Sequence, residues 1–188
     1  IIKSHYQLNN NVEILTSEIR NGSAGQHFFS LFRHVNVENF DYIALSDQDD
    51  IWLPGKLFNA VAMLSTTRSG GYSCASRAFW NNGQEKVLYQ SSSETECDFL
   101  FEGAGQGCTF VLTKDLFLVV QNFCINNKPL TNKFYYHDWL IYIVSRSFNF
   151  KWFFESTPFI LYRQHQNNDT GALSGFSSIK SRLMLIKN

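Results

Sequence analysis

Short apolar blocks separated by polar stretches predict alternating strands and helices along this chain. Tyr42 to Leu45 is an unbroken apolar run, as expected for a strand buried on both faces of a parallel sheet. Upstream of it, Val12 to Leu15 is expected to form a first strand, and helical spacing predicts a helix from Gly25 to Val35. The side chains of this helix that are expected to face the core are Phe28, Phe29, Leu31 and Phe32.

The pattern after the central strand continues the alternation and then becomes mixed. Pro54 suits the first turn of a helix reaching about Leu64, and Tyr72 to Trp80 is expected to pair with Lys86 to Gln90 across an Asn-Asn-Gly turn. Further helices are expected at Lys114 to Gln121 and Trp139 to Phe148, and further strands at Cys108 to Leu112, Lys151 to Phe154 and Phe159 to Tyr162. The order of these elements indicates an α/β fold with an antiparallel appendage.

Composition indicates one ordinary globular domain. The chain has 188 residues, of which 44% are hydrophobic and 17% charged, so it can bury a core and disorder is not expected. The formal net charge is zero, which argues against a nucleic-acid partner held by bulk electrostatics. No apolar stretch approaches the roughly 18 residues of a membrane span. Four scattered cysteines without a CxxC pair suit a reducing cytosol, and the start at Ile1 suggests a piece of a longer protein.

Clustered carboxylates directly after the central strand are the first candidate for chemistry. Asp47, Asp49 and Asp50 lie within four positions, and carboxylates this close repel one another unless a cation or hydrogen-bond donors neutralise them. Open α/β sheets bind ligands where a strand ends and a helix follows. The alternative is a solvated acidic loop.

Three further stretches carry polar groups next to apolar elements, and each has a plain structural explanation as well. The glycines of Glu102 to Gly107 match neither a dinucleotide fingerprint nor a phosphate-binding loop, and they suit either close approach to a ligand or a bulge. Asp138 starts a helix, where a carboxylate is also favourable with the helix dipole. His165 lies in six consecutive polar residues, Arg163 to Asn168, and a lone histidine there is usually an ordinary surface residue.

In this order, the pieces resemble the family 2 glycosyltransferases, in particular the rhamnosyltransferase-like branch that builds bacterial surface polysaccharides. The pieces are SDQDDIW at Ser46 to Trp52, the glycine stretch before Cys108, His137-Asp138-Trp139, and YRQH at Tyr162 to His165 with Asn167 and Asn168. The resemblance covers about Val12 to Gly171 and implies a GT-A type fold, a nucleotide-binding α/β sandwich with a mixed, mainly parallel sheet flanked by helices. It also implies that residues 1–188 are a single partial domain without the first nucleotide-binding β-α-β unit.

The resemblance assigns roles to individual residues. Asp47 and Asp49 match the DxD pair, with Asp49 as the direct ligand of Mn²⁺ or Mg²⁺ and Asp47 nearer the ribose or a metal-bound water. His165 is expected at the metal or the diphosphate. Asp50 and Arg163 are further donor-binding candidates, and Asp138 is the expected general base. The residues expected to shape the acceptor pocket are Gly105, Gly107, Cys108, His137 and Trp139.

The implied function is that of an inverting, metal-dependent hexosyltransferase. It would move a sugar, with rhamnose as the candidate, from a dTDP- or UDP-sugar to a saccharide or lipid-linked saccharide in cell-surface polysaccharide synthesis. The implied location is cytoplasmic, with the inner face of the cytoplasmic membrane as an option. Two alternatives stay open: a non-catalytic nucleotide- or carbohydrate-binding remnant, and a metal-dependent phosphotransferase or hydrolase, although GxSxG, HExxH and paired histidines are missing.

Overall fold

A computed structural model describes residues 12–14, 23–90 and 94–164, which form a six-stranded sheet with helices packed against it. The strands are β1 (Tyr42–Ala44), β2 (Ile51–Trp52), β3 (Gly71–Phe79), β4 (Glu85–Leu88), β5 (Val111–Thr113) and β6 (Trp152–Arg163). The helices are α2 (Ala24–His34), α3 (Lys56–Thr67), α4 (Lys114–Asn126), α5 (Lys128–Thr131) and α6 (His137–Ser147). Two 3-10 turns, η1 (Asp98–Leu100) and η2 (Gly107–Thr109), precede β5.

The sheet is mixed, with the strand order β1-β5-β3-β6-β2 and with β4 paired to β3. The two long strands, β3 and β6, run parallel and form its centre. The β1–β5, β2–β6, β3–β4 and β3–β5 pairs are antiparallel. The expected α/β class is therefore confirmed, but the sheet is not mainly parallel as expected, because β3–β6 is the one parallel pair among the described strands.

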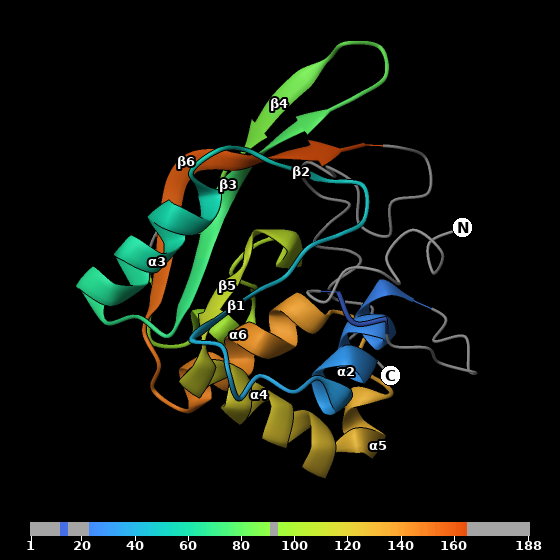
Figure 1. Ribbon diagram of the computed structural model, residues 1–188, viewed down its shortest axis with the longest axis vertical. Coiled ribbons are helices and arrows are strands. Elements are labelled where there is room, and N and C mark those ends of the chain that lie inside the picture. Colours follow the sequence, from blue (N-terminus) through green and yellow to red (C-terminus); the bar gives the residue numbers. More distant parts are fainter. Residues whose placement is uncertain (1–11, 15–22, 91–93, 165–188) are drawn as a thin grey trace.

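The helices cover the sheet unequally (Figure 1). Helix α3 packs alone beside β3 and β6, whereas α2, α4, α5 and α6 gather on the other side, and the β3–β4 hairpin extends away from that group. A separate core lies under each layer: Leu64, Tyr72 and Ile160 belong to the core beneath α3, and Phe29 and Ile141 belong to the one beneath the helix group. The sheet thus forms the middle layer of a sandwich.

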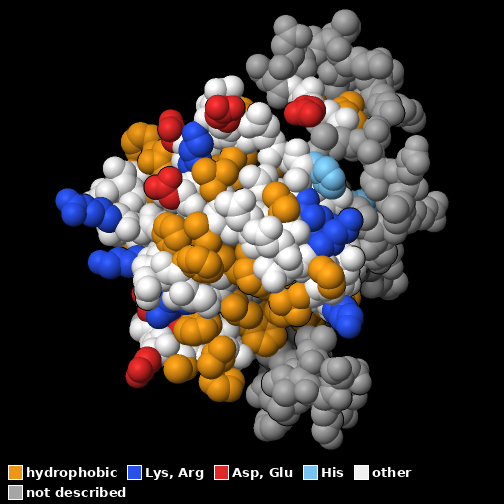
Figure 2. All heavy atoms as spheres, turned by 90° about the horizontal axis from the view of Figure 1, so that it is seen from below, with side chains coloured by type: hydrophobic (Ala, Val, Ile, Leu, Met, Phe, Trp, Pro, Cys, Tyr) orange, Lys and Arg blue, Asp and Glu red, His pale blue; other side chains and the backbone are white. Residues whose placement is uncertain are grey.

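The surface of the helix group shows hydrophobic side chains between scattered Lys and Arg (Figure 2). Leu118 and Ile125 of α4 and Leu130 of α5 are among the exposed large hydrophobic residues. Nevertheless, no described helix has both the length and the hydrophobicity that crossing a membrane requires. All four cysteines are free thiols.

Several expected elements need correction. Residues 12–14 have no regular secondary structure, so the described part of the expected first strand is not a strand. Leu31 of α2 is 42% exposed and does not face the core, although its Phe neighbours are buried. Pro54 lies outside α3, because Gly55 with φ 88° is the N-cap residue and the helix begins at Lys56. The two strands expected after Phe148 are one strand, β6, with an irregular register beside Ala75.

The central strand is also less buried than its apolar run predicts. The residues of β1 are half-buried, and the strand pairs antiparallel with β5 rather than within a parallel sheet. This pairing brings the end of β1 beside the start of β5, with Ala44 opposite Val111. The amide of Leu45 continues the pairing by donating to the carbonyl of Phe110 at 3.1 Å. The acidic loop after β1 therefore begins next to the glycine stretch.

Candidate active site

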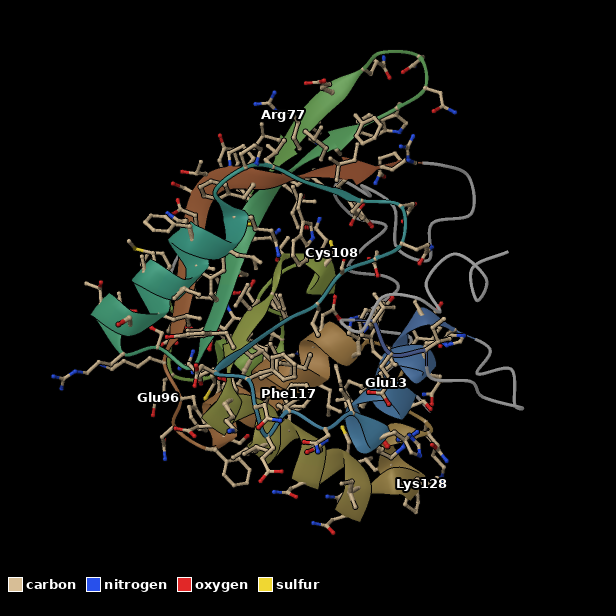
Figure 3. All side chains as sticks on the ribbon, viewed as in Figure 1. Glu13, Arg77, Glu96, Cys108, Phe117 and Lys128 are labelled. Carbon is tan, nitrogen blue, oxygen red and sulfur yellow. The ribbon has the colours of Figure 1, made fainter. Side chains whose placement is uncertain are left out.

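Two of the three clustered carboxylates meet a buried thiol. Ligand atoms of Asp47, Asp50 and Cys108 all lie within 4.8 Å of one another. Figure 3 shows Cys108 on the side of β5 that faces the loop running from β1 to β2. Cys108 was expected in the acceptor pocket, and its contact with the acidic group follows from the antiparallel β1–β5 pairing.

Asp50 is a half-buried carboxylate of this group, bound from two directions. Its Oδ1 accepts the backbone N–H of Arg163 at 3.2 Å, and its carboxylate also hydrogen-bonds to the Cys108 thiol. Burial raises the pKa of Asp50, and these two hydrogen bonds oppose the rise. Burial, together with the charges of Asp50 and Asp47, raises the pKa of Cys108 well above that of an ordinary thiol. The buried Oδ2 of Asp50 has no hydrogen-bond partner among the described residues.

Asp49 lies outside the group formed by Asp47, Asp50 and Cys108. Its backbone carbonyl accepts a hydrogen bond from Nε of Arg163 at 3.3 Å. The grouping therefore favours Asp50 as the carboxylate that acts together with Asp47. The role of Asp49 as the direct metal ligand stays a prediction.

Arg163, the last residue of β6, contacts the acidic loop through both its backbone and its side chain. Its backbone binds the carboxylate of Asp50, its side chain binds the carbonyl of Asp49, and its guanidinium lies 4.9 Å from the centre of the Phe79 ring. These contacts indicate that Arg163 positions the loop. A contact between Arg163 and a diphosphate stays a prediction, and His165, Asn167 and Asn168 lie outside the described residues.

Lys56 is a charged neighbour of the acidic group that the sequence analysis did not select. Its side chain is 2% exposed, and its ammonium lies 3.8 Å from the centre of the Trp52 ring, without a hydrogen-bond partner among the described residues. Burial lowers its pKa to about 8, while Cys74, Cys108 and Asp50 favour the charged form. The sequence pattern contained a signal for the burial of Lys56: it lies four residues before Ala60 and so belongs to the buried face of α3.

His137 begins α6 on the other side of the glycine stretch. Its ring stacks on Phe28 of α2 at 4.0 Å, and its buried Nε2 has no hydrogen-bond partner in the described part of the chain. Burial lowers the pKa of His137 to about 4, so the imidazole is neutral at pH 7. A Cβ on Gly107 would lie 2.4 Å from Nε2, so only glycine permits this close approach.

Asp138 and Trp139 follow in the first turn of α6. Oδ1 of half-buried Asp138 accepts the backbone N–H of Trp139 at 2.8 Å, which stabilises the start of the helix. The indole N–H of Trp139 donates to the carbonyl of Phe99, and Gly103 packs against the Trp139 backbone. Gly105, with φ 114°, lies instead against Gln90. The helix-terminal role of Asp138 is thus observed, and its role as a base stays a prediction.

Turn η2 joins the two sides. Gly107 contacts His137, the residue before Asp138, while the next residue, Cys108, belongs to the group with Asp47 and Asp50. Because consecutive Cα atoms are about 3.8 Å apart, the two sets of residues are neighbours across a single peptide. The glycine stretch was expected to serve the acceptor alone, but it forms the boundary between both sets.

The chain forms a mixed α/β sandwich in which Cys108, beside the clustered carboxylates, follows the glycine that contacts the start of α6, and such an arrangement suits a nucleotide-sugar glycosyltransferase. No protein-family model matches the chain. The chain is similar to the dTDP-rhamnosyl transferase RfbG of Shigella flexneri, with 38% identity over 177 residues. The match includes 94% of this chain and 61% of that protein, so the chain spans about three-fifths of its relative's length. The resemblance to a rhamnosyltransferase-like glycosyltransferase is therefore confirmed.

Proposed function

We propose that this protein transfers a sugar, with rhamnose as the first candidate, from a nucleotide diphosphate to a saccharide or lipid-linked saccharide. The donor is a dTDP- or UDP-sugar, and the product contributes to a cell-surface polysaccharide. Similarity to a dTDP-rhamnosyl transferase supports the donor class. The observation that carries the proposal is the junction at Gly107 and Cys108, where the acidic group and the start of α6 meet.

The residues present suit a divalent cation at the acidic group. The carboxylates of Asp47 and Asp50 are hard ligands, and the buried Oδ2 of Asp50 has no hydrogen-bond partner among the described residues. The thiol of Cys108 is a soft group that suits neither Mg²⁺ nor Mn²⁺ well, so we assign it to hydrogen-bonding Asp50. Mn²⁺ or Mg²⁺ bound here would neutralise the charge that builds on the departing diphosphate. Asp49 and His165 are the remaining ligand candidates.

The acceptor is activated on the side of α6. We assign Asp138 as the general base, which takes the proton of the acceptor hydroxyl as that oxygen attacks the anomeric carbon. A single base and in-line attack invert the anomeric configuration. His137 stays neutral beside Asp138 because burial lowers its pKa, and it therefore adds no positive charge that would weaken the base. Trp139 and Gly107 shape the pocket for the acceptor.

Three further expectations belong to the same proposal. The chain acts as a single glycosyltransferase domain, it works in the cytoplasm, and it reaches lipid-linked acceptors at the inner face of the cytoplasmic membrane. Each of these expectations needs its own measurement.

The test is donor cleavage measured with the 188-residue chain and with the complete gene product. Purified protein is incubated with dTDP-rhamnose, UDP-glucose or no donor, with Mn²⁺, Mg²⁺ or EDTA, and the released nucleotide diphosphate is quantified. Metal-dependent release of dTDP from dTDP-rhamnose, increased by a saccharide acceptor, supports the proposal. Release of inorganic phosphate would instead favour the hydrolase alternative, and tight donor binding without cleavage would favour the non-catalytic alternative.

A further inference from the structure

The segment 94–107, here called the arm, lies along one face of α6. Three side chains of the helix, spaced three and four positions apart, donate hydrogen bonds to it. They are Trp139 to the carbonyl of Phe99 at 2.8 Å, Tyr142 to Asp98 at 2.5 Å and Arg146 to the carbonyl of Thr95 at 3.2 Å. Residues at this spacing share one helix face, so the arm follows the helix axis for two turns.

Asp98 is the centre of this attachment. Its side chain is 3% exposed, and one of its oxygens accepts the hydroxyl of Tyr142. Arg146 donates from Nη1 to both carboxylate oxygens, at 3.0 and 3.2 Å, and its side chain is 14% exposed. Glu94, 3.9 Å from Nη1 of Arg146, accepts the backbone N–H of Trp152 and so connects the arm to the start of β6.

Stability alone is a weak reason for such a buried ion pair. Taking two charges out of water has a large desolvation cost, and replacing a buried pair by apolar side chains of similar volume is often neutral or stabilising. The pair instead defines the geometry. Arg146 and Tyr142 can bind Asp98 only when the arm lies at one position along the axis of α6, and this position is here called the register of the arm.

That register matters at the other end of the arm. The Cβ position of Gly103 lies 3.6 Å from Cα of Trp139, and that of Gly107 lies 2.4 Å from Nε2 of His137. Both contacts flank Asp138 in the chain. A shift of the arm along α6 would therefore move the glycine stretch relative to Asp138.

We propose that Asp98 and Arg146 are positioning residues that set the register of the arm on α6 and thereby the shape of the acceptor pocket around Asp138. The inference rests on the proposed glycosyl transfer and adds to it two residues that lie outside the motifs of the sequence. The pair acts mainly on the acceptor side, because Gly103 and Gly107 belong to the arm whereas Asp47 and Asp50 belong to the loop between β1 and β2.

Nuclear magnetic resonance tests the register without a substrate. The indole N–H of Trp139 and the amide N–H of Gly103 and Gly107 report the position of the arm, and those of Trp52 and Asp50 report the donor side. Asp98→Asn should shift the arm signals by more than the donor-side signals. The control is Arg77→Met, which breaks the exposed Arg77–Glu85 ion pair, with 43% and 56% of the side chains exposed, and which should shift neither set.

A double variant separates positioning from stability. Asp98→Leu with Arg146→Met replaces the ion pair by apolar groups and is expected to keep a melting temperature close to that of the wild type. We expect it still to lose transfer of rhamnose to p-nitrophenyl monosaccharide probes by on the order of 10²-fold, as for a misplaced pocket, while calorimetry still shows binding of dTDP with Mn²⁺. Arg146→Lys, which keeps the charge, should show an intermediate loss.

The outcomes distinguish the two proposals. Wild-type Trp139 and Gly107 signals in folded Asp98→Asn or double-variant protein overturn the inference, and so does wild-type transfer to the probes by the double variant. If the wild-type protein cleaves no dTDP-rhamnose, the proposed function is contradicted instead. The shift of the arm signals in the resonance spectra then tests the role of Asp98 and Arg146 in setting the register without any activity measurement. If Asp98→Asn does not fold, the double variant supplies both readouts.

Discussion

Two aspartates, half-buried Asp50 in the acidic loop and buried Asp98 in the arm, differ in their hydrogen bonding. Each is held by an arginine from a distant element, Arg163 of β6 and Arg146 of α6. Both oxygens of Asp98 are bonded within the protein, whereas Oδ2 of Asp50 has no partner among the described residues. A buried acceptor without a partner costs about 1–3 kcal/mol, so such a group calls for an explanation, and a ligand is the natural one.

The difference also appears in how the two arginines act. Arg146 uses its guanidinium to neutralise Asp98 directly. Arg163 binds Asp50 through its backbone N–H and turns its side chain to the carbonyl of Asp49 and the ring of Phe79. The charge of Asp98 in the arm is thus balanced within the protein, while the backbone of the acidic loop is held by Arg163 and Oδ2 of Asp50 has no partner among the described residues.

The largest expected effect concerns the base on the acceptor side. Asp138→Asn keeps the size and the hydrogen bond to the Trp139 amide but cannot take a proton, so sugar transfer should fall by about 10² to 10⁴. Donor binding, measured by calorimetry with dTDP and Mn²⁺, should be unchanged. Transfer at the wild-type rate would restrict Asp138 to a helix-terminal role.

The second effect is a loss of stability at acid pH that arises on the acceptor side. Burial lowers the pKa of His137 from 6.5 to about 4 in the folded state. The unfolded chain then binds a proton first as the pH falls through 6.5, so stability decreases down to about pH 4, by roughly 3 kcal/mol in total. His137→Phe should flatten this part of the profile in urea unfolding. The control is His34→Phe at an exposed position, which should leave the dependence of stability on pH as in the wild type. Equal profiles for the wild type, His137→Phe and His34→Phe would contradict the assignment of the acid-pH loss to His137.

The third prediction separates the acidic residues on the donor side. Asp50→Asn should weaken Mn²⁺ binding by at least the 10- to 100-fold typical of a lost outer partner, since Asp50 belongs to the group with Asp47 and Cys108. Asp49→Asn is the matched comparison and should weaken it less. Electron paramagnetic resonance of free Mn²⁺ measures both. A larger loss for Asp49→Asn would restore the DxD assignment from the sequence, in which Asp49 is the direct ligand.

The smallest expected effect tests the positioning role of Arg163. Arg163→Lys retains the charge and the backbone hydrogen bond to Asp50 but removes the Nε bond to Asp49, so Mn²⁺ affinity should fall by no more than about tenfold. A guanidinium that bound the diphosphate instead would leave Mn²⁺ affinity unchanged and raise the KM for dTDP-rhamnose. Titrating the metal and the donor separately distinguishes the two roles.

Local chemistry predicted most elements correctly. The α2 and α6 helices, the β3–β4 hairpin and the strand before the acidic loop follow from periodicity and from turn residues such as Gly83 with φ 82°. These features depend on neighbours within a few positions, so the sequence shows them directly. The expected buried parallel strand at Tyr42 was wrong because pairing partners come from distant parts of the chain.

The sequence by itself showed the resemblance to glycosyltransferases and the motifs that carry it: the acidic run, the glycine stretch and the aspartate at the start of α6. Only the tertiary structure decided their partners. Sheet register placed Cys108 beside Asp50, the end of β6 brought Arg163 to the acidic loop, and packing against α6 made Asp98 a buried anchor. The physical reason is that a strand or helix pattern is set by local backbone geometry. Contacts between residues some fifty or more positions apart, such as Asp50 with Cys108 and Arg163, depend instead on how the whole chain packs.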